Sequence, residues 1–184
     1  MARNTSADEF VYDECGGFGD GVSVFVDDNI KGLTVDSDGE RIEMLDIKVV
    51  PFNAGDPVLA DKDEEIDGTS KTAKEIYANQ KAHAHGVVAQ MLYNTYRFIM
   101  LDERDIDPEA MLSIDIEDDD VWNKILREMS TALWVKSEAN SKKKVESKKD
   151  MKKRTGQESP NLNDAIIMCY APNDLAFSDY GSIL

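Results

Sequence analysis

The chain has 184 residues, a length typical of one domain, and its 37 acidic and 21 basic residues give a formal net charge of −16. This charge excludes a uniformly basic nucleic-acid-binding protein and disfavours binding to an anionic membrane surface, whereas the 41% of apolar residues are enough for a core. With no transmembrane-length apolar run, no secretory signal and two distant cysteines, Cys15 and Cys169, the sequence predicts a reduced intracellular protein.

The first part of the chain predicts two strands around a glycine-rich turn and a helix. A short apolar run at 10–13 ends on an acid, and a glycine-rich segment follows it at 16–21. Apolar residues at 22–30 favour a helix after that turn, and those at 44–52 favour a second strand. Because no Gly-Lys-Ser/Thr follows the glycines, the segment does not match a Walker A phosphate-binding loop.

One long helix is expected over residues 71–100, where apolar side chains recur at i, i+3 and i+4. Gly86, inside this helix, marks either a bend or a close contact. His83 and His85 are two positions apart, so they point to different faces of the helix. We therefore expect two separate surface or packed histidines rather than a shared metal site.

The second half of the chain predicts two further helices and a pair of strands. Residues 118–120 are three aspartates before an apolar helical stretch, where they suit the positive end of the helix dipole. Residues 131–136 and 144–147 are expected to pair as strands across a loop. Pro160 suits the first position of a last apolar helix, which extends to about residue 170.

Charge is distributed unevenly along the chain. Residues 102–120 hold ten acids and one arginine, whereas residues 142–154 hold eight basic residues and two acids. A basic patch on an acidic body can direct a polyanion to one place while the rest of the surface repels it. A solvated loop with ordinary surface lysines explains the same composition, so the charge pattern alone leaves both interpretations open.

Two carboxylates stand where a metal site could form. Asp13 ends the first strand, and Asp164 lies in the first turn of the last helix. Carboxylates from a strand end and a helix can together hold Mg²⁺ or Mn²⁺, and two such ions can drive phosphodiester hydrolysis. Among 37 acids, however, a strand-end residue and a helix N-terminal residue also explain the pair without any metal.

Four segments, in order along the chain, share a resemblance. They read Val-Tyr-Asp-Glu-Cys-Gly-Gly-Phe-Gly-Asp-Gly at 11–21, Val-Val-Pro-Phe-Asn-Ala-Gly at 49–55, Tyr-Ala-Asn-Gln-Lys-Ala at 77–82, and Glu-Ser-Lys-Lys-Asp-Met-Lys-Lys-Arg at 146–154 followed by Ser-Pro-Asn-Leu-Asn-Asp-Ala at 159–165. Together they resemble the nuclease domain of the large terminase subunits of tailed bacteriophages. The last motif is the most specific, and the resemblance covers about residues 9–172.

This resemblance implies an α/β, ribonuclease H-like fold with a mixed sheet flanked by helices. The domain would span residues 1–172, with a C-terminal tail at 173–184. The implied activity is metal-dependent endonucleolytic cutting of concatemeric viral DNA during head filling, with Mg²⁺ or Mn²⁺ at a two-metal site. Asp13 and Asp164 carry over as catalytic, metal-binding residues. The implied DNA-binding residues are Lys148, Lys149, Lys152, Lys153 and Arg154.

The resemblance also implies partners: double-stranded DNA, other terminase components and the portal protein, in the cytoplasm of a bacterial host and without a membrane. The chain departs from the family pattern, since the family's first catalytic aspartate and its ATPase domain lie upstream of the segment matched here. Asn161 replaces the usual aspartate of the Ser-Pro-Asp motif. An N-terminally truncated domain with an incomplete metal site is therefore expected, with a sheet edge exposed for self-association.

The alternative is a non-catalytic remnant of the domain that binds DNA or the portal. A third interpretation is an unrelated acidic protein that binds Ca²⁺ or nothing. No EF-hand loop, with its glycine and glutamate at fixed positions, fits residues 56–67 or 102–120. Metal-binding and cleavage assays would separate the enzyme from the remnant.

Overall fold

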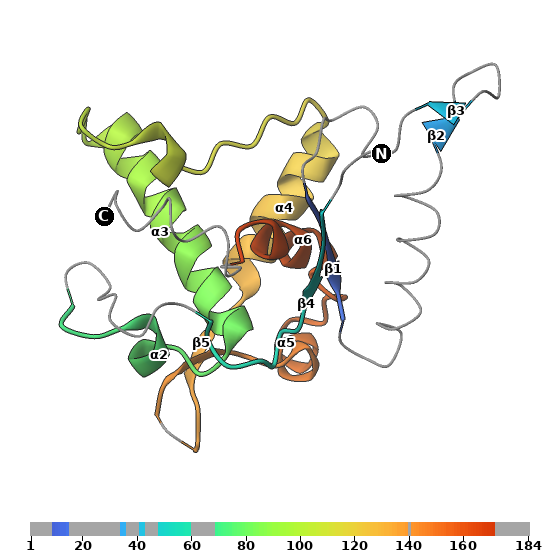
Figure 1. Ribbon diagram of the computed structural model, residues 1–184. Helices are drawn as coiled ribbons and strands as arrows, with labels where there is room; N and C mark the ends of the chain where they lie inside the picture. Colours follow the sequence, from blue (N-terminus) through green and yellow to red (C-terminus); the bar gives the residue numbers. More distant parts are fainter. Residues whose placement is uncertain are drawn as a thin grey trace. The chain divides into compact units, whose positions relative to one another are not determined.

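A computed structural model describes residues 9–14, 34–35, 41–42, 48–59, 69–139 and 141–171 of the chain (Figure 1). The chain divides into two compact units, residues 1–54 and 55–184. The expected glycine-rich turn, the expected helix at 22–30 and the expected tail at 173–184 lie outside the described residues.

In its described residues, the first unit contains two pairs of strands. β1 (Glu9–Asp13) pairs in parallel with β4 (Lys48–Phe52), and the Lys48 ammonium lies 2.9 Å from the Glu9 carboxylate. β2 (Thr34–Val35) pairs in antiparallel fashion with β3 (Arg41–Ile42). The strand expected at 10–13 is confirmed, and the strand expected at 44–52 is confirmed over residues 48–52, whereas residues 44–47 lie outside the described part of the chain.

The second unit begins with two helices where the apolar pattern predicts one. α2 (Ala73–Ile76) and α3 (Gln80–Met100) are separated by residues 77–79. The reason is local: the Asn79 side chain accepts a hydrogen bond from the Ala82 amide at 3.0 Å, which starts α3 afresh. Tyr77, in the break, forms an isolated parallel bridge with Lys143.

The next elements follow the sequence closely. After a 3₁₀ turn, η2 (Pro108–Ala110), α4 (Asp119–Thr131) begins at the aspartate run, and Asp118 accepts hydrogen bonds from the Asp120 and Val121 amides. β5 (Trp134–Lys136) and β6 (Lys143–Val145) form the expected antiparallel pair.

The second part of the basic run, from Lys148 onwards, is a helix and not a solvated loop. α5 (Lys148–Thr155) begins where the Ser147 hydroxyl accepts a hydrogen bond from the Asp150 amide at 3.1 Å, and it ends at Gly156, whose φ is 71°. A serine cap at the start and a left-handed glycine at the end are the usual boundaries of a short helix. The high charge of this segment does not indicate a helix, but the serine and the glycine at its two ends do.

The last helix, α6 (Asn161–Cys169), connects the other helices of the second unit. It packs against both α3 and α4, and α3 also contacts β6 (Figure 1). Its Ile167, with Val88 of α3 and Ile125 of α4, is almost fully buried in this core. In the part of the chain that the structure describes, no helix has the length and apolar character needed to cross a membrane.

Gly86 marks a close contact rather than a bend. A Cβ atom built on Gly86 would lie 2.2 Å from the Tyr77 hydroxyl oxygen and 2.4 Å from its Cζ. The Tyr77 ring has little room to move, because it stacks on His83, with a centroid separation of 5.5 Å, and packs against Trp134 and the buried Val58. Glycine here lets the chain segment before α3 lie directly on the helix.

We predict that Gly86→Ala destabilises the protein, by about 1–3 kcal/mol in urea unfolding, because the new methyl group overpacks against Tyr77. In a solvent-facing helix the same change would stabilise by about 1 kcal/mol. The Tyr77→Ala background supplies the control: there Gly86→Ala should become neutral or stabilising. The same destabilisation in both backgrounds would contradict this account of the contact.

Candidate functional site

Asp164, one of the two carboxylates singled out in the sequence, lies between two lysines. Lys81 of α3 places its Nζ 2.9 Å from Oδ1, and Lys148 of α5 places its Nζ 2.7 Å from Oδ2. The three residues come from three different helices and are as many as 83 positions apart in the chain. The Asp164 side chain is only 16% exposed, so this is a partly buried charge cluster rather than a surface ion pair.

The two lysines keep Asp164 ionised. Burial by itself raises the pKa of the Asp164 carboxyl, but the Lys148 hydrogen bond and the Lys81 charge outweigh burial and hold the pKa below its ordinary value. At neutral pH the cluster therefore carries one negative and two positive charges. The excess positive charge and the exposure of Lys148 suit the binding of an anion such as a DNA phosphate.

Glu128 of α4 places Asp164 by capping the start of α6. The cap position of α6 is Pro160, which offers no side-chain hydrogen bond. Instead, the Glu128 Oε2 accepts from the Leu162 amide at 2.8 Å and the Asn163 amide at 3.1 Å. Glu128 is 6% exposed; its bond to the Asn163 amide is buried and its bond to the Leu162 amide is partly buried. The two amides directly precede Asp164, and the cap therefore determines where its carboxylate lies.

Lys81 is positioned by the residues before it in the Asn-Gln-Lys motif. Asn79 caps α3, and the buried Gln80 ties the helix to the preceding loop. The Gln80 amide donates to the Asp56 carbonyl at 2.8 Å, and the Gln80 Oε1 accepts from the Leu59 amide at 3.2 Å. Lys81 is not among the site residues that the sequence predicts, although its motif carries part of the family resemblance.

The other basic residues of the sequence prediction divide into two groups. The Arg154 guanidinium is bonded to other groups of the protein. It pairs with Glu146 and donates to the Thr131 carbonyl, so it joins α5 to the end of α4 and to the segment after β6. Lys149, Lys152 and Lys153 are exposed on α5, and Lys152 lies 3.5 Å from the exposed Glu158.

Asp13, the other predicted carboxylate, is the last residue of β1 in the first unit. Within the second unit, Asp164 is a single carboxylate whose two oxygens each accept from an ammonium group. Among the described residues, no group of three His, Cys, Asp or Glu side chains could hold a metal ion. The described residues around Asp164 therefore do not by themselves supply the oxygen ligands of a divalent cation, which would also have to displace a lysine.

The two histidines of α3 are packed, as one of the sequence alternatives predicts. Burial lowers the pKa of each to about 4, so both rings are neutral at physiological pH. His83 stacks on Tyr77, and His85 meets Trp134 edge-on at 6.3 Å between ring centroids.

Comparison with known proteins supports the sequence resemblance. No protein-family model and no curated protein matches the chain. Among solved structures, the nuclease domain of the large terminase subunit of bacterial virus Sf6 is 26% identical with a TM-score of 0.77, and the match covers 94% of this chain and 68% of that one. A lysine-to-alanine variant of that domain with manganese is 25% identical with a TM-score of 0.75, over 94% and 69% of the two chains.

A further structure of the Sf6 variant, with calcium, is 24% identical with a TM-score of 0.75, covers 94% of this chain and 68% of that one, and supports the fold. These matches confirm the resemblance to a phage terminase nuclease domain and the α/β, ribonuclease H-like fold. They also relate the role of this chain to that of a terminase nuclease.

We predict that Glu128→Ala lowers the free energy of unfolding by about 2–3 kcal/mol, because two α6 amides, one buried and one partly buried, lose their carboxylate acceptor. Urea unfolding measures the effect. Glu138→Ala, which removes the same side chain from the exposed turn between β5 and β6, is the matched control and should change stability by less than about 0.5 kcal/mol. Equal effects of the two substitutions would show that the cap contributes nothing.

The depressed pKa of Asp164 predicts a pH-dependent stability. Its folded-state pKa lies below the unfolded value of about 3.9, so its stabilising effect is present above that pH and is lost as the pH falls through the folded-state pKa. The difference in unfolding free energy between wild type and Asp164→Asn should therefore be largest near neutral pH and should shrink in acid. A difference that stays constant on acidification would refute the ion-pair cluster.

Proposed function

We propose that this protein is the metal-dependent endonuclease domain of a viral DNA-packaging terminase, which cuts concatemeric DNA during head filling. One observation carries the proposal: an ionised aspartate, Asp164, lies between Lys81 and Lys148 in a fold that resembles the terminase nuclease of virus Sf6, including a form with manganese. The anion-binding charge of this cluster suits a phosphodiester substrate.

In this proposal Asp13 and Asp164 are the metal-binding, catalytic carboxylates, and Mg²⁺ or Mn²⁺ is the cofactor. The chain's own residues have two tasks that the described geometry supports. Lys148, whose side chain is half exposed, can turn from Asp164 to a DNA phosphate. Lys81 is more deeply placed, at 21% exposure, and keeps Asp164 ionised and oriented.

The proposed DNA-binding surface is the exposed side of α5. Lys149, Lys152 and Lys153 extend it from Lys148, whereas the Glu146 pair of Arg154 assigns that residue to holding the helix in place. So few phosphate contacts imply a shallow dependence of affinity on salt. The proposed partners are double-stranded DNA, other terminase components, the portal protein and, through a sheet edge, a second copy of the chain, all in the bacterial cytoplasm.

A second candidate function is a non-catalytic remnant of the domain that binds DNA or the portal. It is favoured by the single carboxylate in the Lys81 and Lys148 cluster and by the absence of a three-ligand metal group among the described residues. The remnant would keep the basic face of α5 and lose cutting.

Plasmid cleavage tests both candidates. The endonuclease should nick DNA with Mn²⁺ or Mg²⁺ and not with EDTA, and Asp164→Asn and Asp13→Ala should each lower the rate at least ~100-fold through loss of a metal ligand. Circular dichroism checks that the variants are folded, and Asp115→Asn, an exposed aspartate outside the cluster, should cut at the wild-type rate.

The outcomes separate the two functions. Cleavage that survives Asp164→Asn, or that persists in EDTA, would rule out the proposed site. A folded wild-type protein that binds DNA without cutting it would establish the remnant. In that case the Lys149→Ala, Lys153→Ala double variant should weaken DNA binding and flatten its salt dependence by about two phosphate contacts.

A further inference from the structure

One side of the second half of α3 is apolar and exposed. Its large side chains are between 41% and 67% exposed, and they are Leu92, Tyr93, Tyr96, Ile99 and Met100. Because residues three and four apart share a side of a helix, these side chains form one stripe along it, the α3 stripe. Tyr93 and Tyr96 stack within the stripe, with 6.4 Å between their ring centroids.

The other side of α3 is covered by the segment that follows the helix. The Asn94 Nδ2 donates to the Ala110 carbonyl at 3.0 Å, and the Thr95 hydroxyl donates to the Leu112 carbonyl at 3.0 Å. These bonds hold residues 110–112 against the helix, whereas the described residues leave the α3 stripe exposed. A contiguous exposed apolar surface is typical of an interaction site.

Charge restricts what can bind the α3 stripe. Although 32% of the chain is charged, every exposed residue of α3 from Ala89 to Met100 is uncharged. Exposed carboxylates follow the stripe at Asp102, Asp105 and Glu109. They would repel a DNA phosphate, and a second copy of the chain would bring a further net charge of −16. The stripe therefore favours an apolar segment with few charges.

Residues 173–184 of the same chain have this chemistry. Their only charged side chains are Asp174 and Asp179. Phe177, Tyr180 and Leu184 are three and four positions apart, the spacing that gives a helix one apolar side. The segment can thus present a continuous apolar side to the α3 stripe.

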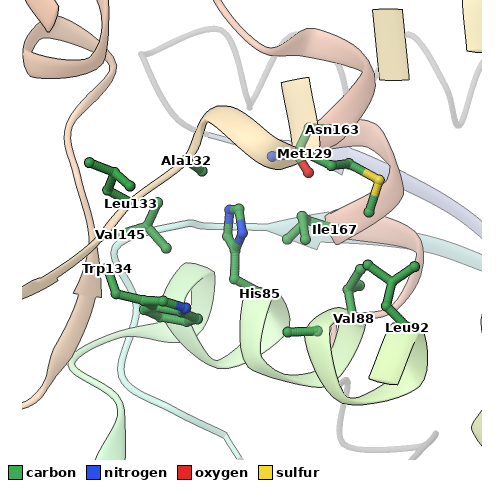
Figure 2. Close-up of a pocket in the computed structure, with 11 residues that line it drawn as sticks. His85, Val88, Leu92, Met129, Ala132, Leu133, Trp134, Val145, Asn163 and Ile167 are labelled. Carbon is green, nitrogen blue, oxygen red and sulfur yellow. The ribbon is translucent and has the colours of Figure 1, made fainter. Parts of the chain in front are cut away.

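This segment follows α6, which contacts α3, so it begins within reach of the stripe. Ile167 of α6 borders the same hollow as Val88 and Leu92 of α3, and Figure 2 shows these three side chains on one side of that hollow. The chain after Ala171 can extend about 43 Å, whereas the α3 stripe covers about 12 Å of helix. Attachment to the same chain also gives the segment a local concentration of roughly millimolar.

We propose that residues 173–184 bind the α3 stripe of the same chain, with Phe177 and Tyr180 packed on its apolar side chains. The contact removes apolar surface of both partners from water, and this burial drives it. It also shields the stripe from apolar partners on other molecules. The proposal does not involve the Asp164 cluster, so it is tested without DNA or metal.

NMR of the full-length chain tests the contact. Nuclear Overhauser effects should join side chains of residues 173–184 to the Tyr96 ring, and the backbone order parameters of the segment should exceed ~0.6. Ile99→Lys places a charge in the α3 stripe at a position that is 65% exposed. It should remove the contacts to Tyr96 and lower the order parameters below ~0.6, because a buried ammonium is costly. Phe177→Ser should have the same effect from the segment itself.

Leu126→Lys is the matched control. Leu126 is 46% exposed on α4 and lies outside the α3 stripe, so its replacement should leave the contacts and the order parameters unchanged. The methyl resonances of the buried Ile167 report whether each variant keeps its fold.

A mixture of isotope-labelled and unlabelled chain distinguishes a contact within one chain from a contact between two copies. An isotope-filtered spectrum of this mixture should show no effect between the segment and the α3 stripe. Contacts in that filtered spectrum, absence of contacts in the wild type, or contacts to Tyr96 that survive Ile99→Lys would each overturn the proposal.

Discussion

The Glu128 carboxylate is the contact on which the geometry of the second unit depends. The first amides of any helix lack partners within the helix, and α6 begins at a proline that offers no side-chain cap. Glu128 supplies the missing acceptor from α4, in a buried position. One carboxylate thereby bonds two α6 amides and joins α6 to α4. It also determines the positions of the adjacent residues Asn163 and Asp164.

Asp164 is a partly buried carboxylate that stays ionised because of its two lysine partners. Burial disfavours the ionised carboxylate, and the two lysines reverse that effect. The arrangement requires the N-terminal ends of three helices to lie close together, since Lys81 is the second residue of α3, Lys148 is the first of α5 and Asp164 lies in the first turn of α6. The same charges that stabilise the carboxylate also compete with a metal ion for its oxygens.

Local signals made much of the fold predictable, and long-range contacts account for the rest. The aspartate run at 118–120 and the strand pair before α5 follow from neighbouring residues, and the structure confirms them. The apolar period and the high charge of these segments do not predict the break before α3 or the helix α5, whereas the capping residues Asn79 and Ser147 do. The Glu128 cap and the Lys81 pair join residues 35 and 83 positions apart, and no local pattern encodes them.

The structure shows which residues of the basic run are paired within the protein and which are exposed. Two of its basic residues are already paired within the protein: Arg154 with Glu146, and Lys148 with Asp164. The number of basic residues in the run is therefore larger than the number that is free to bind a ligand. The exposed lysines of α5 remain as a narrow positive face on a chain of net charge −16. Such a face attracts a polyanion in one orientation while the acidic remainder opposes others. Because Lys148 belongs both to that face and to the Asp164 cluster, the positive face of α5 and the buried carboxylate are continuous with each other.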